Sequence, residues 1–245
     1  MITDAVFKIG ASHKVCQDYA IATPSKVVIC DGCSTGRHVD VGARVLAHMD
    51  DVFSTEAFTA VTKHLSLEQP DMSSTYLRLM DINSQAFTFL RIGDGFLFRK
   101  VGETLEVHEY HYKGNAPYYI AYQHFGMDEQ WQSQFSDNAA IETIWTFGKD
   151  FKLVDKKEQP CSGQKQFIEI WGVDQDYIGI ASDGLSSFQD SNKNPVALDK
   201  IVPILFNYKN FTPGFLQRRV QMAEKEFAKL GWSHYDDLSM GVIVK

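Results

Sequence analysis

The chain has 245 residues, 44% of them hydrophobic, and a formal net charge of -7. These values fit a globular protein that buries a substantial core. The negative charge argues against nucleic acid or an anionic membrane surface as the main partner, because both attract clustered Lys and Arg. No apolar run resembles a signal peptide or approaches the roughly 20 residues of a membrane span, so we expect no membrane partner and a cytoplasmic location.

The first half of the chain changes its hydrophobic period twice. Runs rich in β-branched and aromatic residues predict strands at 5–10, 19–23 and 26–30. Apolar residues then recur at helical spacing from Asp40, and a second helix is predicted over about 55–67. The period returns to two in four further segments, which predicts antiparallel strands at 74–80, 86–92, 95–100 and 104–110.

The second half begins with a segment that lacks a clear pattern. Residues 111–165 contain many aromatic side chains without periodicity, so we expect loops and short elements there. Strands at 167–172 and 177–182, helices at 196–208 and through 216–230, and a strand at 238–245 are predicted after it. No repeat or linker divides the sequence, which predicts one domain over 1–245 with an α+β fold, antiparallel sheets covered by helices.

Cys30 and Cys33 form a C-x-x-C pair that encloses Asp31 and Gly32. A structural zinc site would need a second pair of ligands, and Cys16 and Cys161 are isolated. A thioredoxin-like motif has small or apolar residues between its thiols, which an Asp does not match. Redox or zinc chemistry is therefore the weaker interpretation. On a strand, Cys30 should point into the core, to the face opposite Asp31.

In the alternative interpretation, Asp31 itself is the functional residue of this segment. Asp31 and Asp183 each follow an apolar strand and precede a Gly, and Asp236 precedes the final apolar strand. Asp-Gly is a common turn dipeptide, so each of these residues taken alone is a turn residue. Three carboxylates at the ends of three buried strands are a pattern typical of a shared binding site, because strand ends hold side chains rigidly.

Two further acids, Asp18 and Asp94, occupy similar settings beside apolar strands. A set of ligands that is all oxygen favours hard divalent cations, Mg²⁺ or Mn²⁺, over zinc. Several carboxylates in one small space would repel each other unless metal charge compensates them. The sequence therefore predicts a centre that binds two metal ions.

The ordered motifs resemble the metal-dependent Ser/Thr protein phosphatases of the 2C type, in particular a bacterial branch. The resemblance rests on six short motifs that span nearly the whole chain, CQD (16–18), CDG (30–32), GA (42–43), IGDG (92–95), ASDG (181–184) and DDLS (236–239). It implies a sandwich of two antiparallel β-sheets flanked by pairs of α-helices. The metals are then expected at one end of the sandwich.

The resemblance also implies a role for each acid. Asp31 would bridge the two metals, with the Gly32 carbonyl on one of them, and Asp183 and Asp236 would complete the other. Asp18 would assist the first metal through water, and Asp94 would bind a weaker third metal. A metal-bridging water would hydrolyse phosphoserine and phosphothreonine in proteins. The implied partner is a phosphorylated signalling protein, with a Ser/Thr kinase as the opposing enzyme.

This chain departs from the family at several positions. His13 stands where well-known members carry a phosphate-binding Arg, and Cys33 stands where they carry a His proposed as general acid. Gln17 and Asp237 replace a Glu and an Asn. His13 is a candidate for phosphate contact or proton donation, against the alternative of a histidine that only satisfies local hydrogen bonds. The general acid is left unassigned.

Two functions remain open from the sequence. The first is metal-dependent hydrolysis of phosphoserine and phosphothreonine. The second is a catalytically weak or inactive phosphatase-like domain that acts as a binding or regulatory module. Decayed members lose core aspartates, whereas Asp31, Asp183 and Asp236 are all present here.

Overall fold

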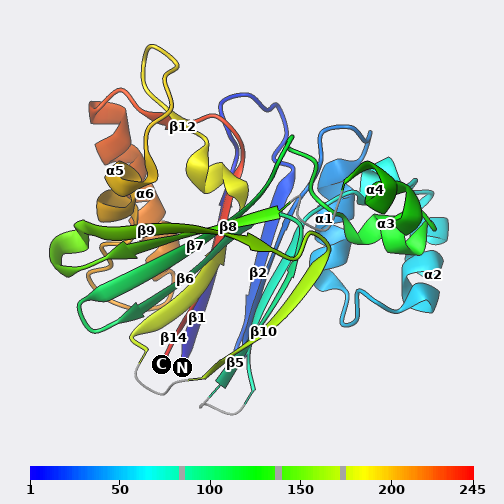
Figure 1. Cartoon of the computed structure of the whole chain (residues 1–245), viewed down its shortest axis with the longest axis horizontal. Helices are drawn as coiled ribbons and strands as arrows, with labels where there is room; N and C mark the ends of the chain where they lie inside the picture. Colours follow the sequence, from blue (N-terminus) through cyan, green and yellow to red (C-terminus); the bar gives the residue numbers. More distant parts are fainter. Residues whose placement is uncertain (83–85, 136–139, 172–174) are drawn as a thin grey trace.

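The structure of the chain is a computed structural model that describes residues 1–82, 86–135, 140–171 and 175–245. Two antiparallel sheets pack face to face, with helices on both outer surfaces (Figure 1). The α+β sandwich expected from the sequence is confirmed. Part of the turn predicted after 74–80 and the last residue of the strand predicted at 167–172 lie outside the described residues.

The larger sheet has seven strands in the order β1-β14-β11-β6-β7-β8-β9. Their bounds are β1 Ile2–Lys8, β14 Leu238–Val244, β11 Tyr177–Ala181, β6 Gly95–Val101, β7 Thr104–Tyr112, β8 Ala140–Phe147 and β9 Leu153–Cys161. The smaller sheet has the order β10-β5-β4-β3-β2. Its strands are β10 Lys165–Trp171, β5 Ala86–Ile92, β4 Tyr76–Asp81, β3 Lys26–Asp31 and β2 Asp18–Thr23.

Helices cover both outer faces of the sandwich (Figure 1). Four of them lie over the five-stranded sheet, α1 Val39–His48, α2 Thr55–Leu65, α3 Ile120–His124 and α4 Asp128–Gln134. Two lie over the seven-stranded sheet, α5 Leu198–Leu205 and α6 Phe215–Lys229. Short elements complete the description, η1 Pro70–Met72, η3 Lys149–Phe151, η4 Asp183–Ser186 and the pair β12 Phe188–Gln189 and β13 Ser233–His234.

The period-two pattern of the strands divides the apolar side chains among three cores. In β3, Val27 and Ile29 face the other sheet, whereas Val28 and Cys30 pack under the α1 side. This alternation is the pleat of a strand that is buried on both faces. Cys30 is fully buried in the outer core, so the expectation that it points away from the face of Asp31 is confirmed.

The prediction of only loops and short elements over 111–165 was wrong. This segment contains two long strands, β8 and β9, besides α3 and α4. β9 is an edge strand whose residues are nearly all exposed, and it includes Pro160. An exposed, charged edge strand buries too little to show an apolar period, and its strand form comes from pairing with β8.

One end of the sandwich collects the residues that the sequence singled out. β1 pairs with β14 from Ile2 opposite Val244 to Lys8 opposite Leu238, so the two termini lie together at one end (Figure 1). The start of β14 therefore lies at the other end, with Asp236 just before it. No helix in the described part of the chain is long and apolar enough to cross a bilayer.

Candidate active site

Four carboxyl groups from separate parts of the chain line one cavity of about 170 Å³. Asp31 ends β3, Asp94 lies in the turn between β5 and β6, Asp183 follows β11, and Asp236 precedes β14. Both sheets thus contribute, and the tertiary fold brings together the predicted residues. Gly32 also lines this cavity.

Asp18 does not line this cavity and is only 2% exposed. It is paired directly with Asp31 across β2 and β3, so the two side chains share one face of the sheet. Two carboxylates in directly opposed positions destabilise a sheet, so a pair of this kind is unusual where it serves structure alone. One oxygen of Asp18, Oδ2, accepts a hydrogen bond from Ser182 Oγ at 2.7 Å, which links the two sheets.

Burial is the largest cause of a raised pKa at each of four acids in this region. It raises the pKa of Asp18 to about 7 and that of Asp94 to about 8, with the charge of Asp183 adding to both. The pKa of Asp31 lies well above its usual range because burial is reinforced by the charges of Asp18 and Asp183. Burial also raises the pKa of Asp183, and the contact with Asp31 opposes that rise.

The lining of the cavity fits divalent cations. No residue of that lining, in the part of the chain that the structure describes, is Lys, Arg or His. Asp18 Oδ1 and Asp183 Oδ1 are buried and have no hydrogen-bond partner. Carboxylate oxygens that have no protein partner are the ligands that Mg²⁺ and Mn²⁺ prefer.

The metal centre itself remains a prediction. Within the described ranges, no three His, Cys, Asp or Glu side chains already stand in an arrangement that could hold a metal ion. The residues that would hold the metals are Gly32 and the four acids that line the cavity, with Asp18 opposite Asp31 on the neighbouring strand.

The backbone around Asp31 is held by its neighbours. The Asp31 carbonyl accepts hydrogen bonds from Ser74 Oγ and Thr75 N, each at 2.8 Å. A Cβ on Gly32 would lie 2.9 Å from the carbonyl oxygen of Gln17, so a larger residue would push the loop apart. The carboxyl group of Asp31 is therefore presented from a rigid strand end.

Close backbone packing also joins the loops that carry Asp183 and Asp236. A Cβ on Gly184 would lie 1.8 Å from the carbonyl oxygen of Asp237, a distance that no side chain allows. Only glycine permits this approach. The Asp-Gly pair thus serves packing as well as chain reversal.

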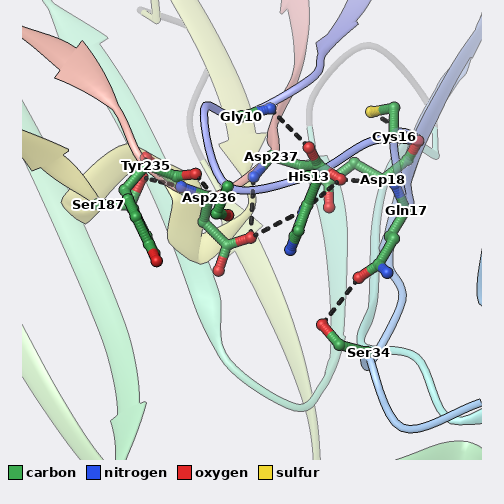
Figure 2. A network of polar contacts seen from close by, with 12 residues as sticks. Gly10, His13, Cys16, Gln17, Asp18, Ser34, Ser187, Tyr235, Asp236 and Asp237 are labelled. Carbon is green, nitrogen blue, oxygen red and sulfur yellow. Dashed lines mark hydrogen bonds and ion pairs between the residues drawn. The ribbon is translucent and has the colours of Figure 1, made fainter.

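Figure 2 shows that Asp237 joins the loop before β2 to the turn before β14. Its Oδ1 accepts the N–H of Gly10 at 2.6 Å and its Oδ2 accepts the N–H of Gln17 at 2.5 Å. His13 Nδ1 lies 3.0 Å from Asp237 Oδ2 and 3.6 Å from Asp236 Oδ1. Asp237 is only 1% exposed, so it acts inside the protein, behind its neighbour Asp236.

His13 is therefore placed against the two aspartates and does not belong to the lining of the cavity. Although its Nδ1 lies near both carboxylates, this buried atom makes no hydrogen bond with good geometry. The arrangement supports a role in orienting Asp236. Direct contact of His13 with phosphate stays a prediction.

The structure adds several residues that the sequence patterns did not single out. Five of them line the cavity, Ser34, Thr75, Asn115, Pro117 and Tyr119. Tyr119 comes from the aromatic segment without periodicity, so no local signal marked it. Cys33, which the sequence marks as a member of the C-x-x-C pair and as a departure from the family, also lines the cavity.

Asp71 is a further buried carboxylate that sequence reasoning missed. It accepts the N–H groups of Arg37 and His38, both at 2.8 Å, and that of Glu68 at 3.0 Å. Burial favours its neutral form, but these N–H bonds prevail and lower the pKa of Asp71. Asp71 thus orders the loop between Asp31 and α1.

A second cavity is larger, about 340 Å³, and lies beside α6. It shares no lining residue with the acidic cavity, and Lys209, Arg218 and Arg219 are among its walls. Arg218 donates to Pro213 O at 2.6 Å and to Thr212 O at 2.9 Å, so its guanidinium is engaged by the loop before α6. The acidic cavity, where the unusual carboxyl groups meet, is therefore the better candidate for chemistry.

Comparison with solved structures identifies proteins that share this fold. The Ser/Thr phosphatase Stp1 from Staphylococcus aureus aligns over 100% of this chain and 95% of its own, with 11% identity and a TM-score of 0.54. PstP/Ppp from Mycobacterium tuberculosis aligns over 99% and 98%, with 15% identity and a TM-score of 0.53. The chain has the fold of the bacterial Ser/Thr phosphatases. The resemblance to this phosphatase family is thereby confirmed for the fold.

Two further solved structures of this fold contain ions or a small molecule. The catalytic domain of PstP, in complex with two manganese ions, covers 98% of this chain and 96% of its own at 15% identity and a TM-score of 0.50. MsPP from Mycobacterium smegmatis, in complex with cacodylate, covers 99% and 97% at 15% identity and a TM-score of 0.51. No protein-family profile and no curated protein sequence matches the chain.

Proposed function

We propose that the protein hydrolyses phosphoserine and phosphothreonine in proteins with two Mn²⁺ or Mg²⁺ ions. The observation that carries this proposal is the meeting of Asp31, Asp94, Asp183 and Asp236 in one cavity that no protein cation lines among the described residues. The fold neighbours support it, because they are Ser/Thr phosphatases and PstP was solved with two manganese ions.

In this proposal Asp31 would be the central residue that holds the metal ions, because Asp18, Asp94 and Asp183 all interact with it. Gly32 offers its carbonyl beside it, and Asp183 and Asp236 approach from the opposite sheet. Asp18 would support Asp31 from the neighbouring strand, and Asp94 would hold a third, weaker ion. The bound cations would lower the pKa of a water molecule and neutralise the phosphoryl oxygens.

The chain itself contributes position and charge. The Asp31 backbone is anchored by Ser74 and Thr75, and Asp236 is backed by His13 and Asp237. Rigid anchoring matters because a displacement of about 1 Å at a catalytic group can cost roughly 10²-fold in rate. The phosphorylated side chain would enter the open side of the cavity.

The test is hydrolysis of a phosphothreonine peptide and an aryl phosphate, with Mn²⁺ and with excess chelator. We expect activity only with metal, and a loss of several orders of magnitude in Asp31→Asn and Asp183→Asn. Asp155→Asn, on the exposed strand β9, is the matched control and should behave as the wild type. Full turnover in chelator, or an active Asp183→Asn variant, would contradict the proposal.

His13 is tested in the same assay. If it contacts phosphate, His13→Ala should raise KM for the phosphopeptide. If it orients Asp236, the variant should lower kcat and weaken Mn²⁺ binding instead, which metal titration by calorimetry separates. Wild-type kinetics and metal affinity would leave His13 with a purely structural role.

The alternative is a phosphatase-like domain that binds a partner without catalysis. The same experiments separate the two functions. A domain of that kind would hydrolyse neither substrate in Mn²⁺, although it could still bind a phosphopeptide. The presence of four predicted carboxyl residues in the cavity lining favours the enzyme.

A further inference from the structure

One phenol faces the acidic cavity from the side covered by α1–α4. Tyr119 lines the cavity together with Cys33 and the four carboxyl residues. It directly precedes α3, is partly buried, and its ring centroid lies 5.5 Å from that of Tyr122. Packing and the start of a helix therefore hold this phenol in a defined position.

The other hydroxyl groups of the cavity wall are engaged. Ser34 Oγ donates its hydrogen to Gln17 Oε1 at 2.9 Å. Thr75 Oγ1 lies 3.3 Å from the N–H of Asp31, which it accepts, and so it supports the strand end. The lining includes no Lys, Arg or His among the described residues. A phenol is more acidic than the aliphatic hydroxyls of Ser34 and Thr75, so Tyr119 carries the hydroxyl of this lining that is best suited to give a proton to a substrate oxygen.

The thiol of Cys33 lies beside Tyr119 in the lining of the same cavity. Sulfur is a weak acceptor, so a substrate oxygen can replace it at little cost. Burial first, and then the charges of Cys33, Asp94 and Asp31, raise the pKa of Tyr119. The phenol therefore keeps its proton at neutral pH, and divalent cations bound in the cavity would oppose the rise in pKa and make this proton easier to release.

We propose that the Tyr119 hydroxyl gives its proton to the leaving oxygen of the phosphorylated side chain, an inference that rests on the proposed phosphatase function. When the bond from phosphorus to the serine or threonine oxygen breaks, that oxygen keeps the electron pair and takes the phenolic proton. The attacking water adds its hydroxyl to phosphorus and releases a proton to solvent. The phenolate of Tyr119 then regains a proton from solvent, so the balance needs no other reactant.

The experiment compares two leaving groups in Mn²⁺. An alkoxide is a strong base and needs a proton to depart, whereas nitrophenolate departs without one. Tyr119→Phe keeps the ring and removes only the hydroxyl. We expect it to lower kcat on a phosphothreonine peptide by about 10²-fold and to leave kcat on p-nitrophenyl phosphate nearly unchanged.

Tyr122→Phe is the matched control, because its ring packs against Tyr119 but does not line the cavity. It should act as the wild type on both substrates, and thermal unfolding should be similar for all three proteins. If Tyr119→Phe lost activity equally on both substrates, or on neither, the inference about Tyr119 would be overturned and the proposed phosphatase function would stand. A wild type without metal-dependent activity would overturn the proposed function and this inference together.

Discussion

The buried acids in and beside the acidic cavity should make the stability of the protein in chelator depend on pH. Burial and mutual repulsion raise the pKa of Asp94 from 3.8 to about 8 and that of Asp18 from 3.8 to about 7. At pH values between 3.8 and these raised pKa values, the folded protein retains protons on Asp18 and Asp94 that the unfolded chain has released. Stability is therefore fully present below the unfolded pKa and is lost as the pH rises toward the folded pKa.

The magnitude follows from proton linkage. Each of these acids lowers the free energy of unfolding by about 1.4 kcal/mol per pH unit within its window. Between about pH 5 and pH 7 both Asp18 and Asp94 are within their windows, so the slope is roughly 1.4 to 3 kcal/mol per pH unit. For a chain of this size, 1 kcal/mol corresponds to about 2–4 °C in Tm. Chelated protein should therefore lose roughly 3–12 °C per pH unit.

The assay is thermal unfolding at several pH values, in chelator and in Mn²⁺. Metal charge replaces the protons, so the loss of Tm with pH should largely disappear in Mn²⁺. Asp94→Asn should make the slope in chelator shallower, because one of the buried acids that hold protons is removed. Asp155→Asn, on exposed β9, should leave the slope unchanged. A chelated wild type that is equally stable across this pH range would refute the reasoning.

Three other changes test the surroundings of the site. Asp237→Asn should cost about 2–4 kcal/mol in urea unfolding, because an amide NH₂ would face the N–H of Gly10 or Gln17; unchanged stability would contradict the network. Cys30→Ser should cost about 1–3 kcal/mol, since it places a hydroxyl in an apolar core, and zinc released by thiol reagents would instead revive the metal-thiolate interpretation. Cys33→Ser should keep Mn²⁺-dependent turnover within roughly an order of magnitude, and a larger loss would give the thiol a direct role.

Local signals in the sequence are enough to identify much of the site. In an apolar run that ends in Asp-Gly, the apolar residues indicate a buried strand and the Asp-Gly pair indicates a reversal of the chain. Asp31 and Asp183 could therefore be assigned to strand ends, and β3 and β11 end where expected. The period of two in β5, β6 and β7 likewise depends on neighbouring residues alone.

Other parts depended on contacts between distant residues. β9 is a strand because β8 supplies its hydrogen bonds, and its own exposed side chains show no pattern. Tyr119 reaches the cavity only because α3 packs beside the smaller sheet. No spacing in the sequence relates it to Asp31.

Asp236 and Asp237 show most clearly which properties the sequence determines and which only the tertiary structure determines. The sequence places both acids before the last strand and predicts a carboxylate at its end, but it assigns them no different roles. The fold does, because Gly10, Gln17 and His13 come from a loop more than 200 residues earlier in the chain and surround Asp237, while Asp236 faces the cavity. Adjacent residues have opposite environments because side-chain direction is local, whereas what lies in that direction depends on how the two sheets pack.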